Sequence, residues 1–280
     1  MDFSFDHKKE NTPEKNDQGL LASAPAACSL SLSEKNEQLQ VTRTNEEFAF
    51  LNSKILIIGK RGSGKTTLIK DIYRQLQNDL DEVHVFNQPK LEAPYHEITN
   101  AVYSDFSLLE DIVEYCRKNP SKKKLLILEN HCDKKQLNIL DDIFYNGRFM
   151  NVTLVIACQY APPMKPEHRY QLDYIFVAND DFYSNKQKLY TYYFGMFPNL
   201  AMFCQIMDSL EQFQFLCTIN RKQTRVIKYK PEIAKVYRFI ETQLVEKGTS
   251  SANKKVQLIK QVNVTIESLI KMRDLLEDYL

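Results

Sequence analysis

The chain has 280 residues and a formal net charge of +1, and 43% of its residues are hydrophobic. This length and composition suit one medium-sized domain with a buried core, and the near-zero charge excludes a uniformly basic nucleic-acid binder. The six cysteines are scattered without a C-x-x-C pair, which argues against a disulfide framework or a zinc site.

Three regions follow one another along the chain. Residues 1–45 are polar and show no periodicity, so we expect a disordered N-terminal tail. Residues 46–220 alternate strand-like and helix-like segments, which is typical of an α/β domain with a mostly parallel central sheet flanked by helices. In chain order, strands are predicted at 54–58, 83–86, 125–128, 152–157, 174–177 and 213–219, and helices at 67–76, 106–118, 134–145, 184–194 and 200–210. Residues 221–280 are predicted to form a basic extension with strand and helical parts, the helices at 231–246 and 254–280.

A glycine-rich motif of the pattern G-x-x-x-x-G-K-[ST] follows the first predicted strand. It consists of Gly59, Lys60, Arg61, Gly62, Ser63, Gly64, Lys65 and Thr66, with Thr67 next in the predicted helix. The glycines let backbone N–H groups wrap phosphate oxygens, and the helix that begins near Gly64 adds its positive dipole end. Lys65 is then placed to reach the β- and γ-phosphates of ATP, and the Thr66 hydroxyl to ligate Mg²⁺. A turn that binds nothing has no need of these two residues, so the motif predicts a nucleotide site.

An acidic position comes directly after the third predicted strand. In P-loop ATPases such a strand ends in an acid that holds Mg²⁺, and Glu129 has this place here, one methylene longer than aspartate. Asn130 follows where a second acid often polarises the attacking water, and a carboxamide cannot accept a proton at neutral pH. Asn130 can still orient a water, and Asp133 or a neighbouring subunit can supply a carboxylate. A rival acid pair, Asp141 and Asp142, lies on a predicted helix and is expected at the surface or against a ring partner.

The predicted strand at 152–157 is followed by Cys158 and Gln159. If this strand lies beside the first one, Gln159 emerges at the carboxyl edge of the sheet, next to the glycine motif. A polar side chain there can form a hydrogen bond with the γ-phosphate or with the attacking water. The alternative, a capped strand end without function, is less favoured because the motif lies beside it.

Together these residues resemble a known family. The features that match are the glycine motif, the leucine-rich strand that ends in Glu129 and Asn130, the run Asn146-Gly147-Arg148, and the stretch from Asn151 through Gln159, Tyr160, Pro166 and Arg169 to Phe176. They look like the genome-packaging ATPases of nucleocytoplasmic large DNA viruses, which include the poxvirus packaging ATPase. That family belongs to the FtsK/HerA-type DNA-translocating motors, so the resemblance implies a RecA/FtsK-like P-loop fold. It covers about residues 50 to 220.

The resemblance implies a ring of subunits that hydrolyses ATP and pushes double-stranded DNA into a capsid, with viral capsid or portal proteins as partners. Gln159 is then the sensor residue, and Arg148 or Arg169 is a finger that reaches the γ-phosphate of a neighbouring subunit. The acid pair of the family is usually Asp-Asp or Asp-Glu. Glu129 and Asn130 depart from it at both positions, which bears on the rate of hydrolysis more than on nucleotide binding.

Two other functions stay open. The first is a nucleotide-binding but weakly hydrolytic paralogue that acts as a structural or regulatory ring subunit, which Asn130 favours. The second is a P-loop nucleotide or nucleoside kinase, although Gln159 at a strand end fits a kinase poorly. A GTPase is disfavoured because the chain has no N-K-x-D motif.

The last part of the chain is its most basic part. Residues 221–280 contain 13 Lys and Arg residues against 7 Asp and Glu, and the basic strip 221–230 has five bases and no acid. Such a strip can follow the phosphates of DNA, and a solvated basic face is the alternative. The chain starts without the apolar core of a signal peptide and has no apolar stretch of bilayer length. We therefore expect a soluble intracellular protein, and the resemblance implies the host cytoplasm or the virion.

Overall fold

The computed structural model describes residues 48–88, 91, 94–99, 101–130, 133–221, 224–232 and 235–236. All of them belong to one compact unit, Leu39–Leu280. The tail predicted for residues 1–45 and the helix predicted for 254–280 lie outside the described residues, as does most of the helix predicted for 231–246.

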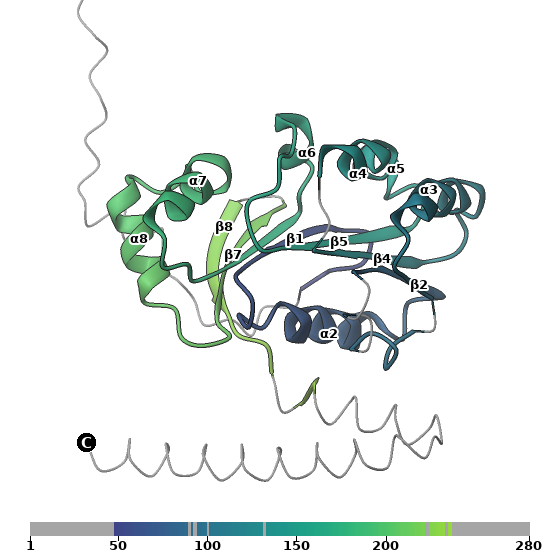
Figure 1. The fold of residues 1–280 in the computed structure, drawn as a ribbon, viewed down its shortest axis with the longest axis horizontal. Helices are drawn as coiled ribbons and strands as arrows, with labels where there is room; N and C mark the ends of the chain where they lie inside the picture. Colours follow the sequence, from purple (N-terminus) through teal and green to yellow (C-terminus); the bar gives the residue numbers. More distant parts are fainter. Residues whose placement is uncertain are drawn as a thin grey trace, which may run out of the picture. The chain divides into compact units, whose positions relative to one another are not determined.

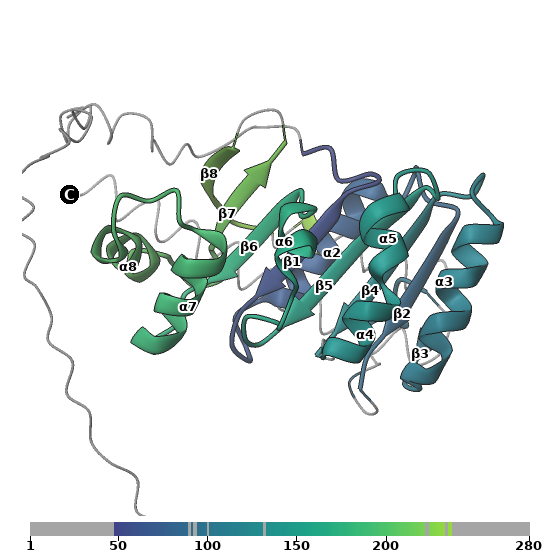
Figure 2. The same cartoon turned by 90° about the horizontal axis from the view of Figure 1, so that it is seen from above.

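An eight-stranded sheet forms the centre of the fold (Figure 1). In chain order its strands are β1 (Lys54–Ile58), β2 (Glu82–Phe86), β3 (Val102–Tyr103), β4 (Lys124–Glu129), β5 (Val152–Cys158), β6 (Tyr174–Ala178), β7 (Phe215–Asn220) and β8 (Thr224–Tyr229). Across the sheet they lie in the order β3-β2-β4-β5-β1-β6-β7-β8, which can be followed in Figure 2. Neighbours from β3 to β6 are parallel, whereas β7 is antiparallel to both β6 and β8. The predicted α/β class with a mostly parallel sheet is confirmed.

Helices cover both faces of the sheet. They are α2 (Lys65–Leu76), the short 3-10 helix η1 (Phe106–Leu108), α3 (Leu109–Lys118), α4 (Lys134–Ile139), α5 (Asp141–Asn146), α6 (Pro166–Tyr170), α7 (Tyr183–Tyr193) and α8 (Leu200–Asp208). Figure 1 shows α2 on one face and α3 to α6 on the other. In β1, Ile55 and Ile57 pack in the core beneath α2, and Leu56 and Ile58 pack in the core shared with α3 and α5. Burial on both faces explains why the strands are continuous apolar runs. Among the described residues, no helix has the length and hydropathy that a bilayer span requires.

The structure differs from the predicted elements in the helix expected at 134–145. It is divided at Leu140, which caps α4 and precedes α5. The expected apolar face is nevertheless present, because Leu137, Leu140, Ile143 and Phe144 are all buried. Two further elements, β3 and α6, are too short for a periodic pattern to reveal.

The sheet continues past residue 220, the end of the predicted ATPase domain. The strand predicted at 213–219 is β7, and β8 pairs with it from Thr224 to Tyr229. In the centre of β8, Val226 and Ile227 are buried, whereas Arg225 is exposed. An edge strand buries few apolar residues, and charged side chains on it prevent pairing with other chains. The basic sequence of β8 therefore resembles that of a surface extension.

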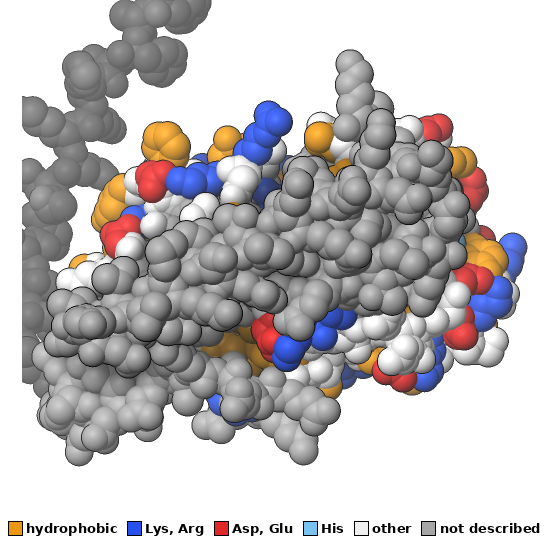
Figure 3. Space-filling model, turned by 90° about the horizontal axis from the view of Figure 1, so that it is seen from below, with side chains coloured by type: hydrophobic (Ala, Val, Ile, Leu, Met, Phe, Trp, Pro, Cys, Tyr) orange, Lys and Arg blue, Asp and Glu red, His pale blue; other side chains and the backbone are white. Residues whose placement is uncertain are grey.

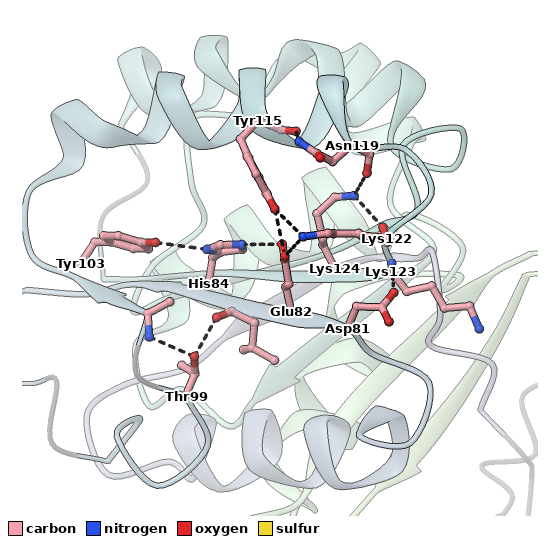
Figure 4. A network of polar contacts seen from close by, with 12 residues as sticks. Asp81, Glu82, His84, Thr99, Tyr103, Tyr115, Asn119, Lys122, Lys123 and Lys124 are labelled. Atoms are coloured by element: carbon pink, nitrogen blue, oxygen red, sulfur yellow. Dashed lines mark hydrogen bonds and ion pairs between the residues drawn. The ribbon is translucent and has the colours of Figure 1, made fainter.

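A polar cluster at the amino-terminal ends of β2 and β4 ties α3 to the sheet (Figure 4). Glu82 Oε1 accepts hydrogen bonds from the Tyr115 hydroxyl at 2.9 Å and from Lys122 Nζ at 2.5 Å. His84 Nδ1 lies 3.3 Å from the Tyr103 hydroxyl, and burial lowers the pKa of His84 against the opposing effect of Glu82. The cluster lies at the edge opposite the carboxyl ends of the strands, so its role is to hold α3 in place.

Candidate active site

The glycine loop, Gly59 to Gly64, joins β1 to α2 at the carboxyl edge of the sheet. At Gly62 and Gly64 the φ angles are 80° and 93°, in the left-handed region that glycine adopts readily. Gly59 starts the loop in close packing, because a Cβ there would lie 2.5 Å from Ser63 Oγ. The Gly59 N–H donates to the carbonyl oxygen of Cys158, 3.1 Å away at the end of β5. The loop is therefore held between the ends of two neighbouring strands.

Lys65 begins α2 and is only 7% exposed. Its Nζ donates to the carbonyl oxygens of Gly59 at 2.8 Å and Lys60 at 3.1 Å, on the inside of the loop. Burial lowers the pKa of Lys65, and the negative charge of Glu129 opposes this effect. An ammonium group held out of water attracts a phosphate more strongly than an exposed one.

The amino-terminal end of α2 has the properties of an anion site. The helix has no side-chain cap and no acid in its first turn. The Leu68 N–H is bonded to the carbonyl oxygen of Gly64 at 2.9 Å, so the N–H groups of residues 65–67 have no partner within the helix. Ser63 Oγ is buried and also has no hydrogen-bond partner. These groups fit a site that phosphate oxygens complete.

The loop residues Lys60 and Arg61 are exposed. Lys60 forms an ion pair with Asp181, which follows β6. The hydrogen bond with Asp181 raises the pKa of Lys60. The tip of the loop is thereby fastened to the neighbouring strand end, and the part of Lys60 and Arg61 in nucleotide binding stays a prediction.

Glu129 ends β4 and lies beside α2. Its Oε1 accepts a hydrogen bond from the Thr66 hydroxyl at 3.3 Å, so the two predicted Mg²⁺ ligands are adjacent. Its Oε2 accepts from Asn87 Nδ2 at 3.0 Å and from the Tyr95 hydroxyl at 2.6 Å. Glu129 is 5% exposed, and these donors offset the cost of burying its carboxylate. Carboxylate and hydroxyl oxygens are ligands that suit Mg²⁺.

Sequence reasoning missed Asn87 and Tyr95. Asn87 directly follows β2 at the same edge of the sheet, which is the signal that also identified Gln159. Tyr95 comes from the connection between β2 and β3, is fully buried, and carries no pattern that announces it. Burial, together with the charge of Glu129, raises the pKa of Tyr95 well above its usual value, so the hydroxyl stays a neutral donor.

We expect Tyr95→Phe to lower the free energy of unfolding by about 1.5–3 kcal/mol, the usual contribution of a hydrogen bond to a charged group. The reason is that the buried Glu129 carboxylate loses its shortest hydrogen bond. Denaturant unfolding measures the change, and Tyr170→Phe is the control because Tyr170 is 88% exposed. Equal stability of Tyr95→Phe and wild type would show that this bond contributes nothing net.

Asn130 follows Glu129 with a φ angle of 63°. Asparagine is among the few non-glycine residues that adopt this left-handed conformation readily. The Asn130 N–H donates to the carbonyl oxygen of Ala157 at 2.9 Å, and Nδ2 lies 3.4 Å from Asn87 Oδ1. The backbone therefore favours asparagine here, and the contribution of its carboxamide to hydrolysis stays a prediction.

We expect Asn130→Asp to leave ATP turnover unchanged or to raise it. Aspartate tolerates the same left-handed backbone, and a carboxylate here restores a general base, which contributes about 10²–10⁴-fold in enzymes. Steady-state hydrolysis measures the effect, with Asn138→Asp on the exposed side of α4 as the matched control. A large fall in turnover would show that the carboxamide itself positions the water.

Gln159 follows β5, which lies beside β1 as predicted, with Cys158 opposite Ile58. It is exposed at the same edge as the glycine loop. Gln159 and Asn130 share a pocket of about 280 Å³. The remaining lining residues are Gln88, Cys158, Tyr160, Ala161, Pro162 and Pro163. The predicted location of Gln159 is confirmed, whereas its contact with a γ-phosphate stays a prediction.

The Poxvirus A32 protein family matches residues 44–182, which contain every predicted site residue. This part of the chain is similar to the poxvirus A32 family. We call residues 44–182 the A32 region. Protein L437 of Acanthamoeba polyphaga mimivirus is 29% identical over 203 residues, 64% of this chain and 71% of L437. Protein 088R of Invertebrate iridescent virus 3 is 25% identical over 172 residues, 56% of this chain and 65% of 088R.

Solved structures of B204, described as the DNA-packaging ATPase of Sulfolobus turreted icosahedral virus, share the fold. One has a TM-score of 0.53 and 18% identity, covering 64% of this chain and 98% of B204. The B204 protein of Sulfolobus turreted icosahedral virus 2, solved with AMPPCP, has a TM-score of 0.50 and 15% identity over 64% and 98% of the two chains. At these identities the likeness concerns the fold.

The two candidate arginines of the A32 region make no hydrogen bond to the glycine loop or to Glu129 within the described part of the chain. Arg148 Nη2 donates to Asp173 Oδ1 at 2.6 Å, and Asp173 Oδ2 accepts from the Lys54 N–H at the start of β1. Arg148 therefore lies at the amino edge of the sheet, opposite the loop. Arg169, in α6, lies over the ring of Tyr192 with its guanidinium 4.8 Å from the ring centre.

The acids considered as alternatives to Glu129 have other partners. Asp133 caps α4 by accepting from two backbone N–H groups at 2.8 and 3.0 Å. Asp141 Oδ1 lies 2.6 Å from His168 Nε2, and Asp142 accepts from Arg117 Nε at 2.8 Å. Among these acids, Glu129 alone lies beside the glycine loop.

The basic strip 221–230 lies beyond the A32 region, and several of its charges have partners among the described residues. Lys228 Nζ donates to Ser209 Oγ at 2.9 Å. Arg221 lies over the ring of Tyr174 at 5.2 Å, and Lys230 Nζ pairs with Glu211 at 2.6 Å. On the face drawn in Figure 3, basic and acidic side chains of the described residues are interspersed. Contact between the strip and DNA stays a prediction.

Proposed function

We propose that this protein is an ATP-driven motor that moves double-stranded DNA into a viral capsid. The observation that carries the proposal is the contact between Thr66 Oγ1 and Glu129 Oε1, 3.3 Å apart beside the glycine loop. It joins the phosphate-binding and Mg²⁺-binding halves of an ATPase site. The similarity of the A32 region to the poxvirus A32 family and the description of B204 as a DNA-packaging ATPase support the packaging role.

Each residue has a task in the proposed reaction. The N–H groups at the start of α2 bind phosphate oxygens, and Lys65 stabilises the negative charge that grows on the transferred group. Thr66 and Glu129 would hold Mg²⁺, which would supply positive charge to neutralise the phosphates. Asn130 and Gln159 orient the attacking water from the pocket that they share. Since residue 130 is not an acid, its contribution is positioning rather than proton transfer.

The proposal includes a ring of identical subunits that encloses DNA and docks on capsid or portal proteins in the host cytoplasm or the virion. The location of Arg148 at the edge opposite its own loop supports an action on a neighbouring subunit rather than on its own nucleotide. The basic strip 221–230 supplies positive charge for the DNA backbone, with a contribution that falls as salt rises.

Asn130 favours a second candidate, a ring subunit that binds ATP but hydrolyses it weakly. In that case the site serves assembly, and another subunit provides the motor. The two candidates share the nucleotide site, and the rate of ATP hydrolysis is the measurement that distinguishes them.

ATP hydrolysis measured with and without linear double-stranded DNA tests the proposal. We expect Mg²⁺-dependent hydrolysis that DNA stimulates, with stimulation lost at high salt. Glu129→Gln is the control variant: it keeps the shape of the side chain, removes the charge, and should bind ATP without hydrolysing it. ATP binding without hydrolysis by the wild type would favour the structural ring subunit, and phosphate transfer to a nucleoside would favour a kinase. Absence of ATP binding would overturn the proposal.

A further inference from the structure

Phe213 has a backbone conformation that aromatic residues rarely adopt. Its φ angle is 62°, in the left-handed region, which is strained for a residue other than glycine. The turn that contains it is closed from both ends: the Gln214 N–H donates to Glu211 O at 3.1 Å, and the Glu211 N–H donates to Gln214 Oε1 at 3.1 Å. Backbone strain of this kind persists where the surrounding structure holds the residue in place, and it is concentrated at active sites and ligand-binding sites.

The ring of Phe213 lies against the glycine loop. A Cβ on residue 64 would lie 2.7 Å from Phe213 Cδ1 and 3.5 Å from its Cγ, so the ring packs on the backbone of Gly64. Gly64 is the last residue before Lys65 and α2. Phe213 itself is only partly buried and belongs to neither hydrophobic core. The ring therefore contributes a half-open apolar surface at the phosphate-binding end of α2.

The strand order places this surface on a particular side of the site. β7 runs antiparallel to β6, with Phe215 opposite Ala178, so Phe213 lies at the carboxyl edge of the sheet. In the order β4-β5-β1-β6-β7, Glu129 and Gln159 lie on one side of the glycine loop and Phe213 lies on the other. In the proposed function, the residues for Mg²⁺ and the γ-phosphate lie on the side of Glu129. The side of Phe213 is then available to the base and ribose of the nucleotide.

A polar atom without a partner lies at the same edge. Asn179 follows Ala178 at the end of β6, and its Oδ1 is buried without a hydrogen-bond partner. It lies one position beyond the last residue pair of β6 and β7, beside the turn that holds Phe213. An aromatic surface and an unpaired amide oxygen together suit a flat, partly polar ring such as a purine.

We propose that Phe213 is the stacking platform for the base of the bound nucleotide. The proposal rests on the proposed function, because it takes the glycine loop as the site of the phosphates. Base stacking on an aromatic side chain depends little on which base is bound, and it adds affinity that the phosphate contacts do not supply. Phe213 thus separates recognition of the nucleoside from recognition of the triphosphate.

Equilibrium binding of two ligands, ATP and inorganic tripolyphosphate, to the full chain tests the platform. We expect Phe213→Ala to weaken ATP binding by about 5- to 150-fold, the loss expected for one stacked base. Tripolyphosphate, which has no base, should bind Phe213→Ala and wild type equally. Phe213→Tyr keeps a ring and should bind ATP as the wild type does. The control is Phe149→Ala, because Phe149 is 83% exposed and lies between α5 and β5 at the opposite edge.

Phe213→Gly removes the ring while relaxing the positive φ angle, so it serves if the alanine variant fails to fold. An equal loss for both ligands would overturn the platform and assign the ring to the shape of the loop. Unchanged ATP binding in the alanine or glycine variant would overturn it as well. If the wild type binds neither ligand, the nucleotide site of the proposed function fails, and the platform fails with it.

Discussion

Lys65→Ala is expected to abolish ATP turnover while changing the free energy of unfolding by no more than about 1 kcal/mol. Lys65 Nζ is held by two loop carbonyl oxygens, and loss of two hydrogen bonds of ordinary net strength is offset by removal of a buried charge. Turnover falls because the ammonium group of Lys65 is the cation held inside the loop by the carbonyl oxygens of Gly59 and Lys60, and a single stabilising group of this kind contributes about 10²–10³-fold or more.

Steady-state hydrolysis and calorimetric binding of ATP measure the effect of Lys65→Ala, and denaturant unfolding measures the stability. Lys188→Ala is the matched control, because Lys188 is an exposed lysine on α7. Turnover and ATP affinity of Lys65→Ala equal to those of the wild type would refute the assignment of the glycine loop. A much lower free energy of unfolding would show instead that Lys65 acts mainly by holding the loop together.

We expect that mixing Lys65→Ala subunits with subunits that lack the correct arginine restores part of the turnover that each variant lacks alone. In a mixed ring an intact loop can face an intact arginine, and an arginine supplied in trans contributes about 10³–10⁵-fold in related phosphoryl-transfer sites. Arg148 is 63% exposed and lies at the edge opposite its own loop, so a neighbouring subunit can reach it. Arg169 is the other candidate, and the mixing experiment is run with each.

The substitutions are Arg148→Lys and Arg169→Lys, since lysine keeps the positive charge but not the flat guanidinium. For Arg148 this matters, because Asp173 is 3% exposed and would lose its ion pair with Arg148 in an alanine variant. Arg117→Lys is the control, because Arg117 pairs with acids on the surface. Turnover per subunit that is independent of protein concentration, with neither arginine needed, would replace the ring by a monomeric enzyme and favour the kinase.

Local patterns predicted the strand, the glycine loop and the helix of the site. Strand β1 and helix α2 follow from short-range periodicity, and the loop conformation follows from glycines at the two positions with positive φ. Glu129 was predicted for a similar reason, because an acid directly after a buried apolar strand emerges at the carboxyl edge of a parallel sheet. The division of the helix at Leu140 and the pairing of β8 with the central sheet were not predicted, because neither interrupts or repeats a clear apolar period.

The sequence by itself determined which chemistry is present: a phosphate loop, a lysine, a hydroxyl, a carboxylate and a carboxamide at strand ends. Only the tertiary structure decided which groups surround them. Tyr95 and Asn87 reach Glu129 across 34 and 42 residues of chain, and Phe213 reaches Gly64 from the far side of β6. Such contacts depend on the order of strands in the sheet, which long-range packing sets and which no local period encodes.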